Sequence, residues 1–157
     1  LFEHSPVAIF EFDYREVIRW FEGLRGRGVT DFDTYAAEHP GELETAIAKV
    51  KLVGLNHETV RLFGAQSKLD LAVDPERMAG SGLAEVRRKI VTALWRGRTE
   101  LAGELTILAF GGEERRVHYR WSLPMLGGRP DYAWTQLVML DVSGVRQVEE
   151  ALAAERE

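Results

Sequence analysis

After Gly97 the apolar residues change from the three-and-four spacing of helices to the alternate spacing of strands. Three strands are predicted in this half of the chain, over residues 101–110, 115–125 and 132–140. Glycine-containing turns at 111–113 and 127–131 separate them. In the middle strand one face is expected to carry Val117, Tyr119, Trp121 and Leu123. Consecutive strands joined by short turns indicate an antiparallel meander with one buried face.

The first half of the chain alternates between helices and two further strands. Residues 7–14 and Lys51–Leu55 are predicted as strands from their β-branched, aromatic and aliphatic residues. Residues 15–49 between them are predicted to be helical, and Asn56 is a good N-cap for the helix that follows. A clear amphipathic helix is predicted over 83–95, and its solvated side is expected to carry Arg87, Arg88 and Lys89.

Length and composition exclude several classes of protein. A chain of 157 residues has the length of one domain, and its apolar fraction of 45% is too high for a disordered tail. The net charge of −5 leaves no broad basic surface for nucleic acid or acidic lipid. The absence of cysteine excludes disulfides, thiolate zinc sites and iron–sulfur clusters. No apolar run approaches the roughly 18 residues that a membrane span needs, so direct membrane insertion is not expected.

No catalytic or metal-binding pattern emerges from the sequence. The histidines show no paired spacing that would suggest a metal site; they are His4, His39, His57 and His118. The serines lack the context of a nucleophile elbow, and no glycine-rich phosphate loop is present. We therefore expect a domain that is not itself an enzyme and holds no metal.

The last fifteen residues return to a helical pattern. Val145, Val148 and Leu152 are spaced three and four apart, which is the spacing of a coiled-coil seam. Because this seam has no partner within one chain, it predicts a homodimer. The chain starts without methionine and ends within this pattern, so we interpret it as a piece of a longer protein.

Four segments together resemble the PAS domain, a sensory module found upstream of histidine kinases and diguanylate cyclases. In chain order they read LFEHSPVAIFEFD, VGLNHETVRLFGA, GELTILAFGGEERRVHYRWSLPML and DVSGVRQVEEAL. The last of these is similar to the Asp-x-Thr motif that precedes the family's signalling helix. Two departures are a helical insertion at 15–49, longer than in most members, and Ser143 in place of the usual threonine.

The resemblance implies an α+β fold with a five-stranded antiparallel sheet, helices on one face, the helical insertion after the first strand, and a C-terminal signalling helix. Residues 1–142 would form the sensor domain, and 143–157 would begin the signalling coiled coil. Asp141, Ser143 and Arg146 would then form the junction that transfers the signal. Physically, a carboxylate and a hydroxyl at this point can cap the emerging helix. A plain cap without a signalling role is the alternative.

A ligand pocket between sheet and helices would be lined by aromatic and polar residues that face inward. The candidates are Trp95, Tyr119, Trp121, Thr135 and Leu137. Such stripes are more often core packing than ligand sites. Haem is not expected, because haem-binding members place a histidine on the helix that corresponds to 83–95, and none occurs there. Cysteinyl-flavin chemistry lacks its cysteine.

The sequence therefore predicts a cytoplasmic sensory module that transmits a stimulus or a small-molecule signal to a fused output domain, either a histidine kinase or a diguanylate cyclase. Two alternatives remain open. One is a ligand-free PAS domain that serves as a dimerisation spacer. The other is a cone-shaped α+β small-molecule binder or enzyme. On the opposite face of the sheet, Trp134, Val138 and Leu140 are expected to pack on the N-terminal segment or on a second subunit.

Overall fold

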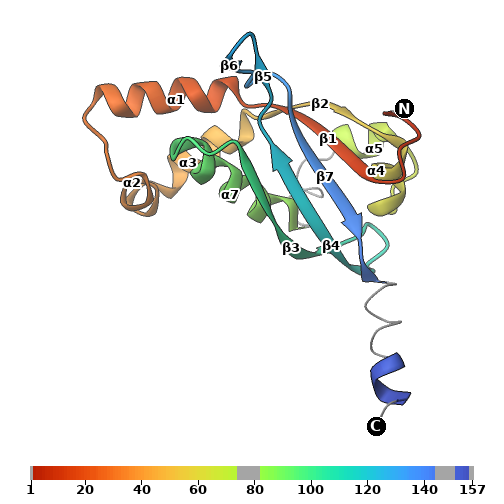
Figure 1. Cartoon of the computed structure of the whole chain (residues 1–157). Helices are drawn as coiled ribbons and strands as arrows, with labels where there is room; N and C mark the ends of the chain where they lie inside the picture. Colours follow the sequence, from red (N-terminus) through yellow and green to blue (C-terminus); the bar gives the residue numbers. More distant parts are fainter. Residues whose placement is uncertain (1, 74–81, 144–150, 156–157) are drawn as a thin grey trace.

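Five strands form one antiparallel sheet in a computed structural model that describes residues 2–73, 82–143 and 151–155. The strands are β1 (Ala8–Asp13), β2 (Lys51–Leu55), β3 (Glu100–Leu108), β4 (Glu114–Ser122) and β7 (Thr135–Asp141). Their order in the sheet is β2-β1-β7-β4-β3, so the first and last strands of the chain lie side by side at its centre (Figure 1). The predicted five-stranded antiparallel sheet is confirmed.

The β3–β4 hairpin is the longest ladder and contains a glycine where a side chain would not fit. Gly103 pairs with Tyr119 across the two strands. A Cβ atom on Gly103 would lie 2.8 Å from the Tyr119 hydroxyl oxygen, because the Tyr119 ring covers this position. The glycine thus lets a buried aromatic ring lie flat over the neighbouring strand. At the tip, Gly112 adopts a φ of 90°, which closes the hairpin and favours glycine.

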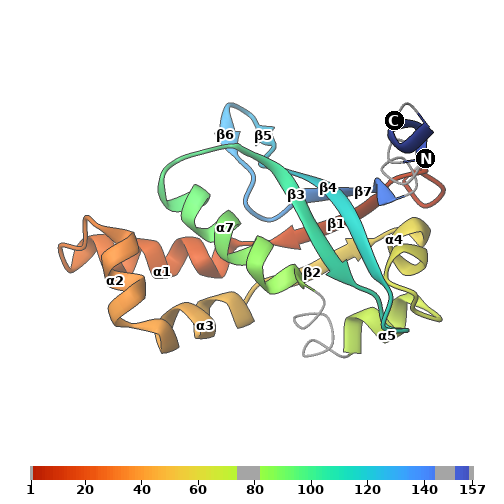
Figure 2. The same ribbon diagram turned by 90° about the horizontal axis from the view of Figure 1, so that it is seen from below.

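The helices lie against one face of the sheet, as predicted, and leave the other face open (Figure 2). They are α1 (Arg15–Gly26), α2 (Phe32–Glu38), α3 (Pro40–Ala48), α4 (His57–Leu62), α5 (Lys68–Val73) and α7 (Ala84–Trp95). Helices α1 to α3 form the segment predicted as a helical insertion and extend beyond one end of the sheet, whereas α4 and α5 lie at the other end. Helix α7 lies between these two groups.

An aromatic cluster joins the three-helix segment to α7. The Phe32 ring stacks on Trp95 with centroids 5.2 Å apart and packs edge-on against Phe21 at 5.4 Å. The Arg25 guanidinium lies 4.2 Å from the Trp95 ring and donates to its carbonyl. At the surface, Arg96, which directly follows α7, pairs with Asp33 at 2.6 Å. Aromatic burial therefore holds these helices, since surface ion pairs contribute little.

Asn56 connects the N-terminal segment, β1 and α4. As predicted, it caps α4, and its side-chain oxygen accepts from the backbone N–H of Thr59 at 3.2 Å. The same oxygen accepts from the N–H of Ile9, and the amide nitrogen donates to the carbonyls of Phe2 and Val7. Asn56 is fully buried, so each of these bonds replaces water.

Several predicted boundaries and one side-chain orientation differ from the structure. The third strand of the meander begins at Thr135 rather than at 132, and the turn before it contains a short hairpin of β5 (Met125–Leu126) and β6 (Arg129–Pro130). Helix α5 was not predicted, because six residues are too few to show a helical period. The placement of Arg87 on the solvated side of α7 is wrong, and its orientation is described below.

Candidate functional site

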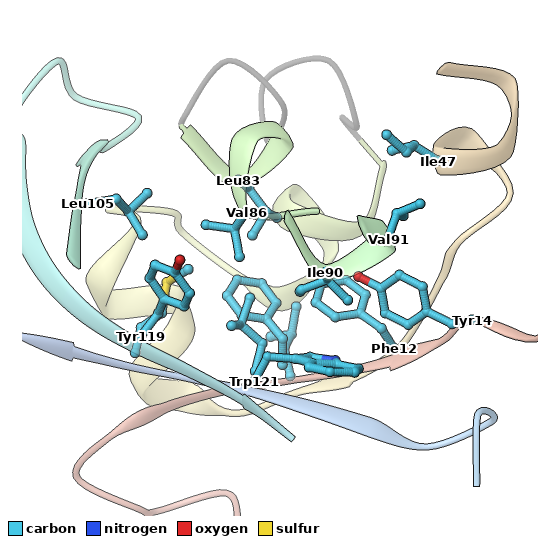
Figure 3. Packing of buried hydrophobic residues seen from close by; sticks show 14 of the residues in the cluster. Phe12, Tyr14, Ile47, Leu83, Val86, Ile90, Val91, Leu105, Tyr119 and Trp121 are labelled. Carbon is cyan, nitrogen blue, oxygen red and sulfur yellow. The ribbon is translucent and has the colours of Figure 1, made fainter. Parts of the chain in front are cut away.

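The inner face of the sheet meets α7 in a closely packed aromatic core. Phe10 and Phe12 of β1 stack at 5.5 Å, and Tyr14, directly after β1, packs edge-on against Trp121 of β4 at 6.5 Å. Figure 3 shows Phe12 and Trp121 directed from the sheet toward Ile90 of α7, with Tyr14 beside them. Leu137 of β7 is also fully buried. Side chains of the chain itself therefore occupy the space between sheet and helix.

Four of the five predicted pocket residues lie in this core. Tyr119, Trp121, Thr135 and Leu137 are all buried. The Thr135 hydroxyl donates to the carbonyl of Phe12 at 3.1 Å, so it serves the sheet itself. The fifth residue, Trp95, makes its ring contacts with Phe21 and Phe32 at the three-helix segment. The structure therefore brings together the four sheet residues and places Trp95 in a different cluster.

Two residues that the sequence analysis did not select add unpaired polar atoms to this core. The hydroxyl of Tyr14 and Nε of Arg87 are buried and have no hydrogen-bond partner among the described residues, and the same is true of Trp121 Nε1. The Arg87 guanidinium carbon lies 5.1 Å from the centre of the Phe12 ring. Burial raises the pKa of Tyr14 and lowers the pKa of Arg87, because each charged form loses its solvation. These three side chains thus each place a buried polar atom without a partner in the core.

The inward orientation of Arg87 follows from helical spacing. Arg87 precedes Ile90, Val91 and Leu94 by three, four and seven residues, and all three are buried. It therefore belongs to the apolar face of α7, although it stands in a basic triplet with Arg88 and Lys89. The other two residues behave as predicted, since Arg88 pairs with Glu44 and Lys89 with Glu85 at the surface. The spacing of Arg87 from the buried residues of α7 could have predicted its inward orientation, but the two surface cations beside it hid this pattern.

At the end of β7 the chain is fixed to the neighbouring strand β4. The Ser143 hydroxyl accepts from the backbone N–H of Arg116 at 2.8 Å, and the N–H of Val142 donates to the Arg116 carbonyl at 2.9 Å. Asp141 accepts from the N–H of Ser143 at 2.9 Å. Two of the predicted junction residues thus meet at one point, while Arg146 lies outside the described residues, as do Val145 and Val148 of the predicted seam.

Arg115 links this junction to the helical side of the molecule. Its guanidinium donates to the carbonyls of Arg61 and Leu62, at the C-terminal end of α4, at 2.9 and 2.6 Å. Arg115 is adjacent to Arg116, whose backbone holds the exit segment. The start of β4 is therefore bonded both to α4 and to the residues that follow β7.

Comparison with known proteins finds no match by sequence and several matches by structure. The sequence matches no protein-family model and no curated protein. Solved structures do match: the PAS domain of a protein from Colwellia psychrerythraea covers 91% of this chain and 92% of its own, with a TM-score of 0.54 and 12% identity. A LOV protein from Rhodobacter sphaeroides covers 99% and 70%, with a TM-score of 0.57 and 18% identity.

A third similar structure is described as a PAS domain in complex with ethanol, from a LuxR-family transcriptional regulator of Burkholderia thailandensis. It covers 90% of this chain and 94% of its own, with a TM-score of 0.50 and 11% identity. Full-length agreement in the order of strands and helices decides the fold. The chain has the PAS fold. The fold expectation drawn from the four sequence segments is therefore confirmed.

The outer face of this PAS-fold sheet carries a partly exposed apolar strip. Trp134 and Leu140 are each 48% exposed, and Val138 between them is partly buried. The Trp134 indole N–H donates to the carboxylate of Glu11 on β1. The described N-terminal residues do not cover Trp134 or Leu140 fully, and cover by a second subunit stays a prediction.

Open hollows in the PAS-fold domain lie away from the aromatic core. One, of about 430 Å³, lies between α1 and α3 and is lined in part by Trp20, Thr45 and Lys49. Another, of about 470 Å³, lies along β2 and is lined in part by Val53 and Leu69. Among the described residues, no cluster of acidic, histidine or cysteine side chains could hold a metal ion. Within that same part of the chain, no helix is long and apolar enough to cross a membrane.

Proposed function

We propose that this chain is the sensory module of a larger signalling protein, and that it regulates a fused histidine kinase or diguanylate cyclase domain. The module itself carries out no catalysis. A change in the core between β4 and α7 alters the direction of the helix that follows Asp141, and the output domain responds to that change. The single observation that supports this proposal most is the attachment of the exit segment to β4.

The attachment provides a short physical route from core to exit. One face of β4 contributes Val117, Tyr119 and Trp121 to the core, and the backbone of Arg116 holds Val142 and Ser143. A shift of β4 relative to α7 would therefore move the first residues of the exit helix. Because backbone hydrogen bonds are short and directional, such a shift changes the angle of the helix rather than being absorbed by a loop.

The output domain is proposed to act as a dimer. Val145, Val148 and Leu152 would form the seam of a two-stranded coiled coil with a second copy of the chain. Leu152, the seam residue that the structure describes, is half exposed and thus available for a partner. In this arrangement a small change of helix angle in two copies becomes a change of register or twist between the output domains.

Substitutions at the junction test the proposal in the full-length protein. Ser143→Ala removes the hydroxyl that accepts from Arg116, and Asp141→Ala removes the carboxylate that accepts from Ser143. Each should lower the free energy of unfolding by about 1 kcal/mol, because Ser143→Ala loses a hydrogen bond to β4 and Asp141→Ala loses the carboxylate that accepts from the backbone N–H of Ser143. Each should also change the rate of phosphotransfer or cyclic dinucleotide synthesis at constant protein concentration.

Thr45→Ala is the matched control, since its hydroxyl donates within α3, far from the exit. It should leave output unchanged. Normal output in both junction variants would refute the signalling role. That result would favour the dimerisation spacer, which is consistent with a core occupied by the chain's own side chains, provided that sedimentation still shows a dimer.

A further inference from the structure

A small hollow on the solvent side of α7, here called the basic hollow, gathers four cations. Its volume is about 290 Å³, and it lies where α7 ends and the chain turns into β3. The charged residues of its lining are Arg88, Lys89, Arg96 and Arg98, and no described carboxylate lines it. In a chain with a net charge of −5, four cations around one hollow favour a negatively charged ligand at this place.

The end of α7 brings Arg98 back beside the last turn of the helix. Gly97 has a φ of 74°, a left-handed conformation that favours glycine. The N–H of Gly97 donates to the carbonyl of Leu94 at 3.1 Å, and the N–H of Arg98 donates to the carbonyl of Ala93 at 2.9 Å. These two bonds form a Schellman motif, which satisfies the last carbonyls of the helix. The Arg98 side chain is therefore not needed as a cap and is available at the basic hollow.

Three carboxylates outside the lining balance three of the four cations. The pairs are Arg88 with Glu44, Lys89 with Glu85 and Arg96 with Asp33. Each side chain in these pairs is about half exposed or more, so the pairs contribute little and can exchange partners at low cost. Arg98 pairs with no carboxylate in the part of the chain that the structure describes, which leaves one positive charge in excess.

We propose that the basic hollow binds the diphosphate group of a small phosphate ester. Guanidinium groups donate in pairs to phosphate oxygens, and three of the four cations are arginines. A diphosphate spreads at least two negative charges over several oxygens, so it can contact Arg98 and a neighbouring arginine at the same time. The volume is at the lower end for small-molecule sites and suits the charged head of such a ligand. The basic hollow lies outside the core between sheet and helix, and this inference does not depend on the proposed sensory function.

Titration of the ¹⁵N-labelled chain with sodium pyrophosphate tests the basic hollow. Ionic strength is kept constant with sodium chloride, because screening would otherwise change during the titration. The amide signals of Thr92, Gly97 and Arg98 should move and saturate with a Kd below about 1 mM. Those of His57 and Arg61, in α4 at the other end of the molecule, should stay in place. Stationary signals at Thr92, Gly97 and Arg98 would refute the site.

Two further probes separate the possible sources of the diphosphate. If ADP binds more than about tenfold more tightly than pyrophosphate, the ligand is a nucleotide. If the two bind equally, the diphosphate group alone is recognised. Adenosine should not move the signals, and binding of adenosine as tight as that of ADP would overturn the proposal.

Two arginine variants assign the binding to the basic hollow. Arg98→Gln removes the unpaired cation and should raise the Kd for pyrophosphate at least about fivefold. Arg61→Gln makes the same change of net charge, at an exposed arginine that pairs with Glu58, and should keep the Kd within about twofold. Equal losses in both variants would show a general attraction to positive charge and would refute a specific site.

Two carboxylate variants should have the opposite effect from Arg98→Gln. Glu44→Gln frees Arg88 from its partner and should lower the Kd, because the carboxylate no longer competes with the ligand. Glu58→Gln, which frees Arg61 at the other end of the molecule, should leave the Kd unchanged. Circular dichroism checks that all four variants are folded. Weaker binding in Glu44→Gln would contradict the proposal.

Discussion

At the scale of single residues, Asn56 shows how one side chain can fix three segments. Its oxygen accepts from the N–H groups of Ile9 and Thr59, and its nitrogen donates to the carbonyls of Phe2 and Val7. The amide group carries an acceptor oxygen and a nitrogen with two donor hydrogens, so it can accept two bonds and donate two at the same time. A carboxylate of the same shape would face two carbonyl oxygens with a negative charge.

Asn56→Asp therefore tests the donor half of this residue. We expect the free energy of unfolding to fall by about 3 kcal/mol or more, because two buried carbonyls lose their donor while the cap is retained. Asp31→Asn, the reverse exchange at the exposed cap of α2, should change stability by less than about 0.5 kcal/mol. Urea unfolding of both variants makes the comparison, and equal losses would show that the amide donors contribute nothing.

At the scale of elements, the three-helix segment depends on aromatic contact with α7. Phe32 lies between Phe21 and Trp95 and is almost completely buried, although α2 has only seven residues. A helix this short is not stable by itself. Its position is therefore determined by the ring that it inserts into the cluster.

Phe32→Ala should lower the free energy of unfolding by about 3–5 kcal/mol, the range for removing a buried phenylalanine ring. Near-ultraviolet circular dichroism should weaken as the rings around the cavity lose their fixed packing. Leu126→Ala, in the exposed hairpin of β5 and β6, should change stability by no more than about 0.5 kcal/mol. A small loss for Phe32→Ala would mean that backbone and surface contacts alone hold α2 in place.

At the scale of the whole molecule, three carboxyl groups make the fold sensitive to acid. Arg15 lowers the pKa of Asp13, Thr34 lowers that of Asp31, and Lys68 lowers that of Glu3. A pKa that is lower in the folded state means that the ionised form stabilises folding above the unfolded pKa. That contribution is lost as the pH falls through the folded pKa.

Asp13 is the most buried of the three, and its carboxylate accepts from both the backbone and the side chain of Arg15. Its ordinary pKa is 3.8. Asp13→Asn should therefore be less stable than the unmodified chain at neutral pH and should lose less stability below about pH 4. Urea midpoints across the acid range measure this, with Asp33→Asn as a surface control. Parallel curves for Asp13→Asn and the unmodified chain would contradict it.

Much of the fold could be predicted because its signals are local. The bounds of β2 and the Asn56 cap follow from an apolar run and one capping residue, and the inward face of β4 follows from strict alternation. The short β5–β6 hairpin could not be predicted, since two-residue strands have no period.

The candidate site was harder to predict than the fold. Trp121 follows from alternation, but Tyr14 stands at the end of a strand, where its direction depends on the chain that follows. Arg87 shares its sequence neighbourhood with two surface cations, which conceal its helical spacing from the buried residues Ile90 and Val91, and its contact with Phe12 in the structure shows that it faces inward. Which polar atoms lack partners is a property of the packed core and cannot be read from the order of residues.

The unpaired donors of the core also bear on how this chain would change under selection. Tyr14→Phe and the replacement of Arg87 by an apolar residue would each remove a buried polar atom that has no hydrogen-bond partner among the described residues. Selection for heat tolerance alone would therefore favour those replacements.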